Sequence, residues 1–209
     1  MKLYGFGPTR SLRAQWALNE VGADYEFISI SLRAGENQTP QFLQLNPAGK
    51  LPVLVDGDVV VPESAAIVLY LADKFKDKGL MPADGAQRAA VYRWVMFAVT
   101  ELEQPLWRIA RNSFIYSEAE RQPSDIVIAR REFTAMAAIL DRHMQGREYI
   151  VGDRFGAADC VTAYIVDWGD NQGLIGDMPA LQAYLERAYA RPTAPRRIAA
   201  AFAELAPAA

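Results

Sequence analysis

The pattern of apolar residues changes roughly a third of the way along the chain, and this change limits the possible folds more than any other feature. Before it, short β-rich runs alternate with helices; after it, apolar residues recur every three or four positions, as they do in helices. The first part contains a strand, a helix, a strand, a short helix, two strands and a helix, at residues 3–6, 11–21, 25–30, 40–45, 51–55, 59–61 and 64–75. This order predicts an α/β unit that is followed by an all-α unit.

Local signals place the ends of these elements. Gly22 follows the first helix, as glycine commonly does, and Thr39 precedes Pro40 as an N-cap precedes a proline at the first helical position. The Asp-Gly-Asp sequence at 56–58 separates two valine-rich runs and predicts a β-hairpin. Ser64 is placed to cap the last helix of this part.

The second part begins after a break in periodicity. Residues 77–85 hold two glycines and a proline, which is typical of a linker. From residue 86 to 209, apolar residues form several stripes at helical spacing. We therefore expect an α/β domain at 1–76, a linker at 77–85 and an all-α domain at 86–209.

Charge and composition disfavour several classes of function. The formal net charge of −3 provides no broad basic surface for nucleic acid or for an anionic membrane. The longest apolar run, residues 65–72, is far too short to span a bilayer. We expect no nucleic-acid partner and no membrane association, and we expect the protein in a reducing, cytoplasmic compartment.

The chain has one cysteine, Cys160, and one histidine, His143. One cysteine allows no intrachain disulfide, and without a second histidine or cysteine we expect no metal site. His143 is expected to be solvated near a helix end, where its charge suits the helix dipole. Cys160 lies in an apolar stretch and is expected to be a buried small apolar residue.

Two hydroxyl residues, Thr9 and Ser11, lie between the first strand and the first helix. Backbone N–H groups at a helix start are unpaired and carry partial positive charge, so a thiolate ligand would be stabilised there, and a hydroxyl could donate to it. The plainer alternative is that Thr9 or Ser11 only caps the helix. The preceding Gly-Phe-Gly at 5–7 is only a weak match to a dinucleotide fingerprint, because Arg10 occupies the position of the third glycine.

Two other places could receive a ligand. A cis bond before Pro52 would leave the backbone of Leu51 open to a peptide ligand, whereas the plainer interpretation is an ordinary strand start. At Glu63 and Ser64, the hydroxyl and the helix N–H groups could hold a carboxylate, or Ser64 could simply cap the helix. Taken alone, these residues leave both alternatives open.

Four motifs in this order resemble the cytosolic glutathione transferase family. They are MKLYGFGPTRSLRAQWAL, with Arg13 at the family's usual arginine; NPAGKLPVL, with Pro52 at its cis-proline; PESAAIVLYLA, with its Glu-Ser helix start; and VGDRFGAADCVTAY, with Asp159 at the acidic position of the helical folding motif. The resemblance covers nearly the whole chain. It implies a thioredoxin-like N-terminal domain and an all-helical C-terminal domain that supplies the hydrophobic substrate pocket.

The residue at the family's activating position indicates the type of member. Thr9 aligns there, four residues before Arg13, with Ser11 as the nearby alternative, and neither a tyrosine nor a cysteine stands at that point. The chain thus resembles bacterial Ser- or Thr-type members, which are theta-, phi- or nu-like. The resemblance implies that Thr9 or Ser11 activates the glutathione thiol.

The resemblance also implies which residues hold glutathione, the cosubstrate, with no metal required. The backbone of Leu51, beside Pro52, would pair with the cysteinyl backbone. Ser64, with Glu63 beside it, would hold the γ-glutamyl carboxylate. The glycyl carboxylate would meet three further side chains, which are Lys50, Asn37 and Gln38.

The implied function is conjugation of the glutathione thiolate to hydrophobic electrophiles, as in detoxification, by a cytoplasmic homodimer. Two alternatives stay open. One is an enzyme of the same fold that reduces disulfides or peroxides with glutathione. The other is a non-catalytic scaffold of that fold, which the presence of all the expected glutathione-binding positions disfavours.

Overall fold

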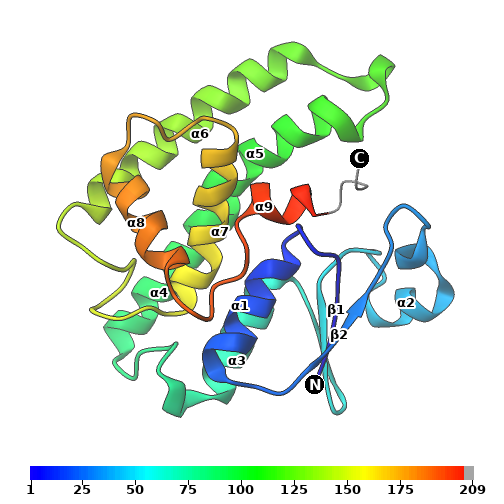
Figure 1. Cartoon of the computed structure of the whole chain (residues 1–209), viewed down its shortest axis with the longest axis horizontal. Helices are drawn as coiled ribbons and strands as arrows, with labels where there is room; N and C mark the ends of the chain where they lie inside the picture. Colours follow the sequence, from blue (N-terminus) through cyan, green and yellow to red (C-terminus); the bar gives the residue numbers. More distant parts are fainter. Residues whose placement is uncertain (205–209) are drawn as a thin grey trace. The chain divides into compact units, whose positions relative to one another are not determined.

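The computed structural model describes residues 1–204, and these form two compact units. One unit comprises Met1–Ala83 together with residues 191–204, and the other comprises Asp84–Ala190 (Figure 1). The first contains a mixed sheet with helices, and the second is helical. The fold class predicted from the sequence is therefore confirmed, whereas the exact division at 77–85 stays a prediction.

The first unit is built on a four-stranded sheet. Its strands are β1 (Lys2–Gly5), β2 (Glu26–Ser29), β3 (Val53–Asp56) and β4 (Val59–Pro62), in the spatial order β2-β1-β3-β4. β1 and β2 are parallel, and the other neighbours are antiparallel. The predicted β3–β4 hairpin is confirmed, and Gly57 in its turn has a φ of +60°, which suits glycine.

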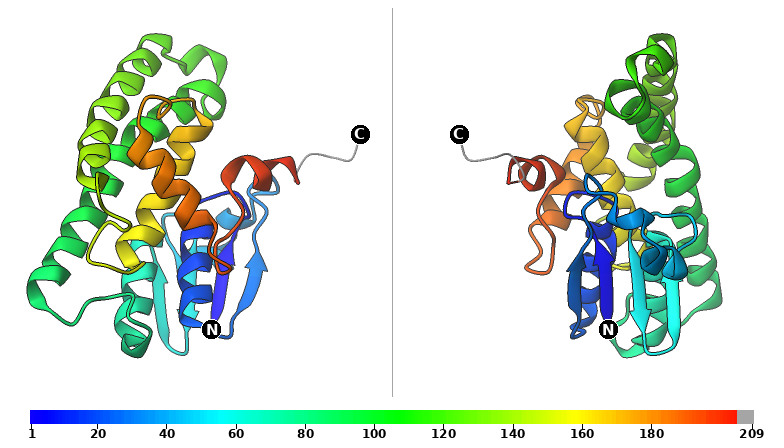
Figure 2. Two further views of the ribbon diagram at one scale, coloured as in Figure 1. Left: turned by 60° about the vertical axis from the view of Figure 1, so that its left-hand side comes forward. Right: turned by 90° about the vertical axis from the view of Figure 1, so that its right-hand side faces the viewer.

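Helices cover both faces of this sheet. α1 (Ser11–Val21) and α3 (Ser64–Lys74) pack together on one face, and α2 (Pro40–Leu45) lies over the other (Figure 2). Between β2 and α2 is the short 3-10 helix η1 (Glu36–Gln38), and η2 (Lys76–Lys78) follows α3. Two predicted helix signals are confirmed: Gly22 ends α1 in the left-handed conformation, and the Thr39 hydroxyl accepts the Phe42 N–H at 3.4 Å.

The segment at Arg191–Thr193, which precedes α9 (Ile198–Ala203), is held against α1. Arg191 donates from Nε and from Nη2 to the two carboxylate oxygens of Glu20, each at 2.7 Å. The Thr193 hydroxyl also bonds to Glu20, and Asn19 Nδ2 donates to the Thr193 carbonyl at 3.3 Å. These contacts fix residues distant in sequence to the C-terminal half of α1.

The second unit consists of helices, with bounds that show where the long predicted stripes are interrupted. They are α4 (Gly85–Phe97), the π-helical η3 (Ala98–Leu102), α5 (Glu103–Ala110), the π-helical η4 (Arg111–Ile115), the 3-10 helix η5 (Glu118–Glu120), α6 (Pro123–Met144), α7 (Ala157–Asn171) and α8 (Pro179–Tyr189). α7 is buried along most of its length. Gly169 lets it approach α6, because a Cβ there would lie 2.3 Å from the Phe133 ring.

The start of α7 is fixed by Asp159. Its carboxylate accepts the Gly156 N–H at 2.9 Å, the Ile150 N–H at 3.0 Å and the Tyr184 hydroxyl at 3.0 Å. Burial, together with the neighbouring Asp159 charge, raises the pKa of Tyr184 well above its usual range. The acidic position that the sequence singled out thus joins the loop before α7 to α8.

The single histidine differs from expectation. His143 is half-buried: its Nε2 lies 2.8 Å from the Ile150 carbonyl oxygen, and its ring centroid lies 4.1 Å from that of Trp94. His143 lies in the last turn of α6, so its predicted place near a helix end is confirmed. The prediction that it is solvated is wrong, because its ring contacts the Ile150 carbonyl and Trp94. Cys160 is fully buried, as predicted.

Residues 1–204 contain neither a helix that could span a membrane nor a cluster of side chains that could hold a metal ion. No helix there combines the length and the apolar character that crossing a bilayer requires. In the same residues, no three histidine, cysteine or acidic side chains gather in a way that could hold a metal ion.

Candidate functional site

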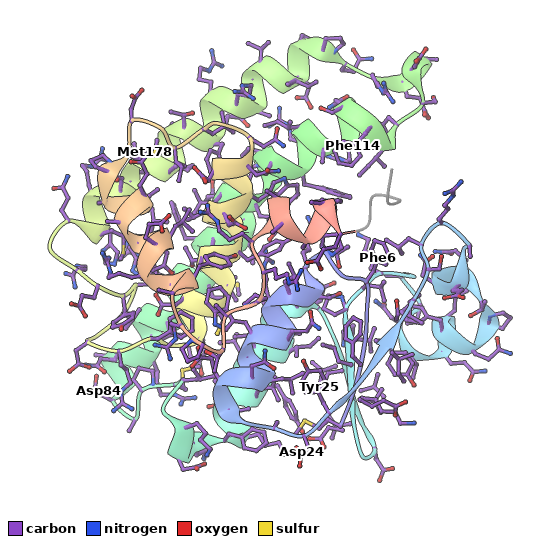
Figure 3. The ribbon with its side chains drawn as sticks, viewed as in Figure 1. Phe6, Asp24, Tyr25, Asp84, Phe114 and Met178 are labelled. Carbon is purple, nitrogen blue, oxygen red and sulfur yellow. The ribbon has the colours of Figure 1, made fainter. Side chains whose placement is uncertain are left out.

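The ends of β1, β3 and β4 meet at one end of the sheet, where β2 also ends at Ser29. β1 ends at Gly5, β3 begins at Val53 and β4 ends at Pro62, and Val53 pairs with Tyr4 on one side and Pro62 on the other. Phe6, the first residue beyond β1, marks this end in Figure 3. The chain segments adjoining these strand ends carry the residues that the sequence singled out, so the topology brings them together.

The segment after β1 forms a compact hydroxyl network. The Thr9 hydroxyl donates to the Phe6 carbonyl at 2.7 Å, and the Phe6 N–H donates to Ser11 Oγ at 3.1 Å. The two hydroxyl oxygens are 2.9 Å apart, and the Ser11 N–H donates to Thr9 Oγ1 at 3.3 Å. Ser11 is fully buried, whereas Thr9 is half-buried.

The capping alternative for Ser11 is wrong. The N-cap residue of α1 is Arg10, which makes no side-chain cap bond, and Ser11 is the first helical residue. It is Thr9 Oγ1 that accepts an N–H of the first turn, while Ser11 Oγ turns toward β1. Gly5 permits this, because a Cβ there would lie 2.8 Å from Ser11 Oγ.

The segment before β3 carries a cis Leu51–Pro52 bond, as the resemblance implies. Within residues 1–204, neither the N–H nor the C=O of Leu51 takes part in a backbone hydrogen bond. This strand start therefore offers an unpaired N–H and C=O to a ligand, which is the arrangement that strand-like peptide binding uses.

The segment after β4 joins a buried arginine to the start of α3. Arg13 Nη1 donates to Ser64 Oγ at 3.2 Å, and both side chains are buried. The prediction that Ser64 caps α3 is wrong, because the N-cap residue is Glu63 and Ser64 is the first helical residue. The N–H groups of the first turn of α3 thus have no side-chain cap and remain available to an anion.

Glu63 has an unusual backbone. Its φ is +69°, and no other non-glycine residue of those the structure describes has a positive φ. Such a conformation costs about 1–3 kcal/mol and occurs preferentially at functional sites. Its side chain is exposed beside the uncapped helix start.

Comparisons with known proteins match both parts of the chain. The family model described as glutathione S-transferase, N-terminal domain, matches residues 1–73, and the one described as glutathione S-transferase, C-terminal domain, matches residues 102–192. Glutathione S-transferase 1 of Dianthus caryophyllus is 35% identical over 170 residues, which cover 78% of this chain and 74% of the relative. This chain belongs to the glutathione S-transferase family.

Relatives that match over the full length support the same assignment. Glutathione S-transferase 3 of Zea mays is 30% identical over 96% of this chain and 94% of its own. The theta class glutathione S-transferase of Xanthomonas axonopodis pv. citri, solved with glutathione bound, superposes with a TM-score of 0.82 at 28% identity, over 94% of this chain and 96% of that one. The protein is thus a glutathione transferase with the thioredoxin-like fold of its family.

Two residues with a clear structural part in this transferase were missed or undervalued from the sequence. Asn46 is buried, its Nδ2 donates to the Lys50 carbonyl at 2.8 Å, and its Oδ1 accepts the Ala48 N–H at 3.1 Å. It thereby shapes the loop that leads to Leu51, and the Asn-Pro pair at its position was the available turn signal. Arg13 was recognised only by resemblance, because its partner Ser64 is 51 residues away.

The three side chains expected near the glycyl carboxylate differ in their roles. Asn37 Nδ2 donates to the Gly49 carbonyl at 2.7 Å, so this side chain supports the loop before Pro52. Gln38 lies over Gly49, whose added Cβ would approach Gln38 Nε2 to 2.4 Å. Gln38 and Lys50 are exposed, so both can reach a ligand at the loop surface.

Proposed function

We propose that this transferase activates the glutathione thiol with the hydroxyl of Thr9. The observation that carries the proposal is the difference in burial between the two hydroxyl residues: Thr9 is half-buried at the start of α1, whereas Ser11 is fully buried. A hydroxyl must reach the ligand to donate to it, and this favours Thr9.

Glutathione is proposed to bind in three parts along the sheet end. Its cysteinyl backbone pairs with the unpaired N–H and C=O of Leu51, beside Pro52. Its γ-glutamyl carboxylate sits at the uncapped start of α3, where Ser64 accepts its bond from Arg13 and so keeps its own proton for the ligand. Glu63 is proposed to receive the γ-glutamyl ammonium group.

The glycyl carboxylate is proposed to meet Lys50 and Gln38, which are both exposed on the adjoining loops. Asn37 is proposed to act there through its hold on the Gly49 carbonyl. A lysine supplies the positive charge that a terminal carboxylate requires.

The reaction itself follows from the thiol's acidity. A free thiol has a pKa of about 8.5, so little thiolate exists at neutral pH, and a hydroxyl donor with helix-start N–H groups lowers that pKa by about one or two units. The thiol proton is released to solvent. The thiolate sulfur forms a bond to an electrophilic carbon, and the carbon's leaving group departs with its bonding electrons.

The second substrate and the assembly are proposed on the family's pattern. We propose that residues 86–209 supply the pocket for a hydrophobic electrophile, in a cytoplasmic enzyme with a detoxifying role. We also propose a homodimer, because exposed apolar side chains on β4 and α4 offer surfaces that a second subunit would cover; they are Val59, Val60, Tyr92 and Met96.

Thr9→Val tests the activating residue, since valine keeps the volume and removes the hydroxyl. Loss of one charge-assisted hydrogen bond predicts a roughly ten- to hundredfold lower kcat/KM with an aryl halide, and a bound thiol that titrates at higher pH. The ultraviolet band of the thiolate reports that titration. If kcat/KM and the titration of the bound thiol are both unchanged, Thr9 does not activate the thiol. Turnover of a mixed disulfide in place of the aryl halide would refute conjugation.

A further inference from the structure

The protons of the Thr9–Ser11 network can be counted. A hydroxyl has one proton to donate and two lone pairs to accept with. Thr9 places its proton on the Phe6 carbonyl, 2.7 Å away, so it cannot also donate to Ser11. In the 2.9 Å contact between the two hydroxyls, Ser11 must therefore be the donor.

The same count shows that Thr9 Oγ1 is saturated. It accepts from Ser11 Oγ at 2.9 Å and from the Ser11 N–H at 3.3 Å, while its own proton goes to Phe6. Ser11 Oγ in turn accepts the Phe6 N–H at 3.1 Å. Both lone pairs of Thr9 are thus held by Ser11, and only the direction of the Thr9 proton is left to change.

We propose that Ser11 is a positioning residue, which donates to Thr9 Oγ1 so that the Thr9 proton turns from the Phe6 carbonyl to the glutathione thiolate. This inference rests on the proposed role of Thr9 as the donor. No proton is transferred in this step; one hydrogen bond is exchanged for another. Because a hydroxyl that accepts hydrogen bonds becomes a stronger donor, the bond from Ser11 strengthens the bond from Thr9 to sulfur.

The Phe6 carbonyl keeps a hydrogen-bond donor when the Thr9 hydroxyl turns away from it. The Thr9 N–H also points at it, with an N···O distance of 3.3 Å, and keeps it paired when the hydroxyl leaves. Ser11 cannot take the place of Thr9, because it is fully buried against Gly5 and its proton is already donated to Thr9 Oγ1. The two hydroxyls therefore have different roles: Thr9 donates to the glutathione thiolate, and Ser11 donates to Thr9.

A double-mutant cycle of Thr9→Val, Ser11→Ala and the double variant tests the proposal. We expect Ser11→Ala to lower kcat/KM by about three- to tenfold, the effect of one neutral hydrogen bond, and to raise the pH at which the bound thiol titrates. In the Thr9→Val background, the same substitution should change neither quantity, because Ser11 then has no hydroxyl to act through.

Ser31→Ala is the matched control. Ser31 Oγ accepts the Ala34 N–H at 3.1 Å, as Ser11 Oγ accepts that of Phe6, and Ser31 has no part in the proposed glutathione contacts. Its substitution removes a comparable side-chain acceptor of a backbone N–H, and we expect it to leave the thiol titration unchanged. A titration shift of the same size in Ser31→Ala would show that Ser11→Ala acts only by loosening the fold.

The outcomes separate this inference from the proposed function. The positioning role of Ser11 is overturned if Thr9→Val shifts the thiol titration and Ser11→Ala does not. It is also overturned if Ser11→Ala shifts the titration equally with and without Thr9→Val. In both cases the proposed role of Thr9 as the donor is retained. If Thr9→Val has no effect, the role of Thr9 itself fails. Should Ser11→Ala not fold, a crystal structure of the unaltered protein with glutathione decides. We expect Thr9 Oγ1 within hydrogen-bond distance of both sulfur and Ser11 Oγ, and separation of the two hydroxyls overturns the proposal.

Discussion

Arg13 and Ser64 form a buried hydrogen bond that joins α1 to the start of α3, with 3.2 Å between Nη1 and Oγ. The guanidinium is always charged and has no acceptor, so in this bond Ser64 is necessarily the acceptor. The serine proton is consequently directed away from Arg13. This relationship makes Ser64 a donor at an uncapped helix start, where an anion is favoured.

Ser64→Ala is expected to weaken glutathione binding by about 1.5–3 kcal/mol, the range for a hydrogen bond to a charged group. Isothermal titration calorimetry measures this directly. Ser31→Ala, whose hydroxyl only accepts the Ala34 N–H, serves as the control and should bind glutathione normally. Unchanged affinity in Ser64→Ala would remove this residue from the site.

Glu63→Gly is expected to raise the free energy of unfolding by about 1 kcal/mol. Glycine adopts the observed φ of +69° without the strain of about 1–3 kcal/mol, and this gain exceeds its entropic cost of about 0.5–1 kcal/mol. Glutathione should bind more weakly to the variant, since the carboxylate is lost. Urea unfolding measures the first effect, with Glu63→Gln, which keeps the strained backbone, as the control. A less stable Glu63→Gly protein would mean that the backbone is not strained.

The sequence predicted the elements whose signals are local. Gly22 after α1 and Thr39-Pro40 before α2 act within one helical turn, so their effects could be read from neighbouring letters. The hydrogen-bond partner of Arg13 could not be predicted from neighbouring residues, because Ser64 lies 51 residues away and the bond depends on how α1 and α3 pack. The burial of His143 likewise depends on the path of the chain at Ile150.

The N-caps of α1 and α3 were also not predicted correctly from the sequence, because the error of one residue in a helix start matters there. Ser11 and Ser64 have the residue type of N-caps and stand at helix starts, yet each is the first helical residue and bonds elsewhere. A shift of one position changes the direction of the hydroxyl, and the sequence does not determine helix starts to one residue. The positions of these hydroxyls in the site therefore required the structure.

Glu20→Ala is expected to loosen the segment that begins at Arg191. Burial alone would raise the pKa of Glu20, but hydrogen bonds from Arg191 and Thr193 lower it below its ordinary value of 4.5. Because Arg191 is partly solvated, we expect a loss of about 1–3 kcal/mol rather than the full cost of a buried pair. Hydrogen exchange of residues 191–197 should accelerate in the variant, and exchange in β1 serves as the internal control.

The same pair gives a pH dependence below the unfolded pKa of Glu20. A lowered carboxyl pKa contributes stability that is present above pH 4.5 and is lost as the pH falls through the lower folded-state value. Glu20→Gln should therefore flatten the fall in stability within that acid window. An equally steep fall in Glu20→Gln would mean that other carboxyl groups dominate there.

His143 should make the protein less stable in mildly acidic solution. Burial lowers its pKa below the ordinary value of 6.5, and the positive charges of Arg147 and Arg93 act in the same direction, against the opposing bond to the Ile150 carbonyl. Below pH 6.5 the unfolded chain binds a proton that the folded chain rejects, so the free energy of unfolding decreases as the pH falls.

The melting temperature, followed from pH 7.5 to pH 5, measures this effect. The chain has one histidine, so no other histidine contributes to the same window. His143→Gln, which keeps a side-chain donor that can reach the Ile150 carbonyl, should lower the melting temperature at pH 7.5, because stacking on Trp94 is lost, and should have a flatter profile between pH 7.5 and 5. If its profile is as steep as that of the unaltered protein, the charge on His143 does not control stability in this range.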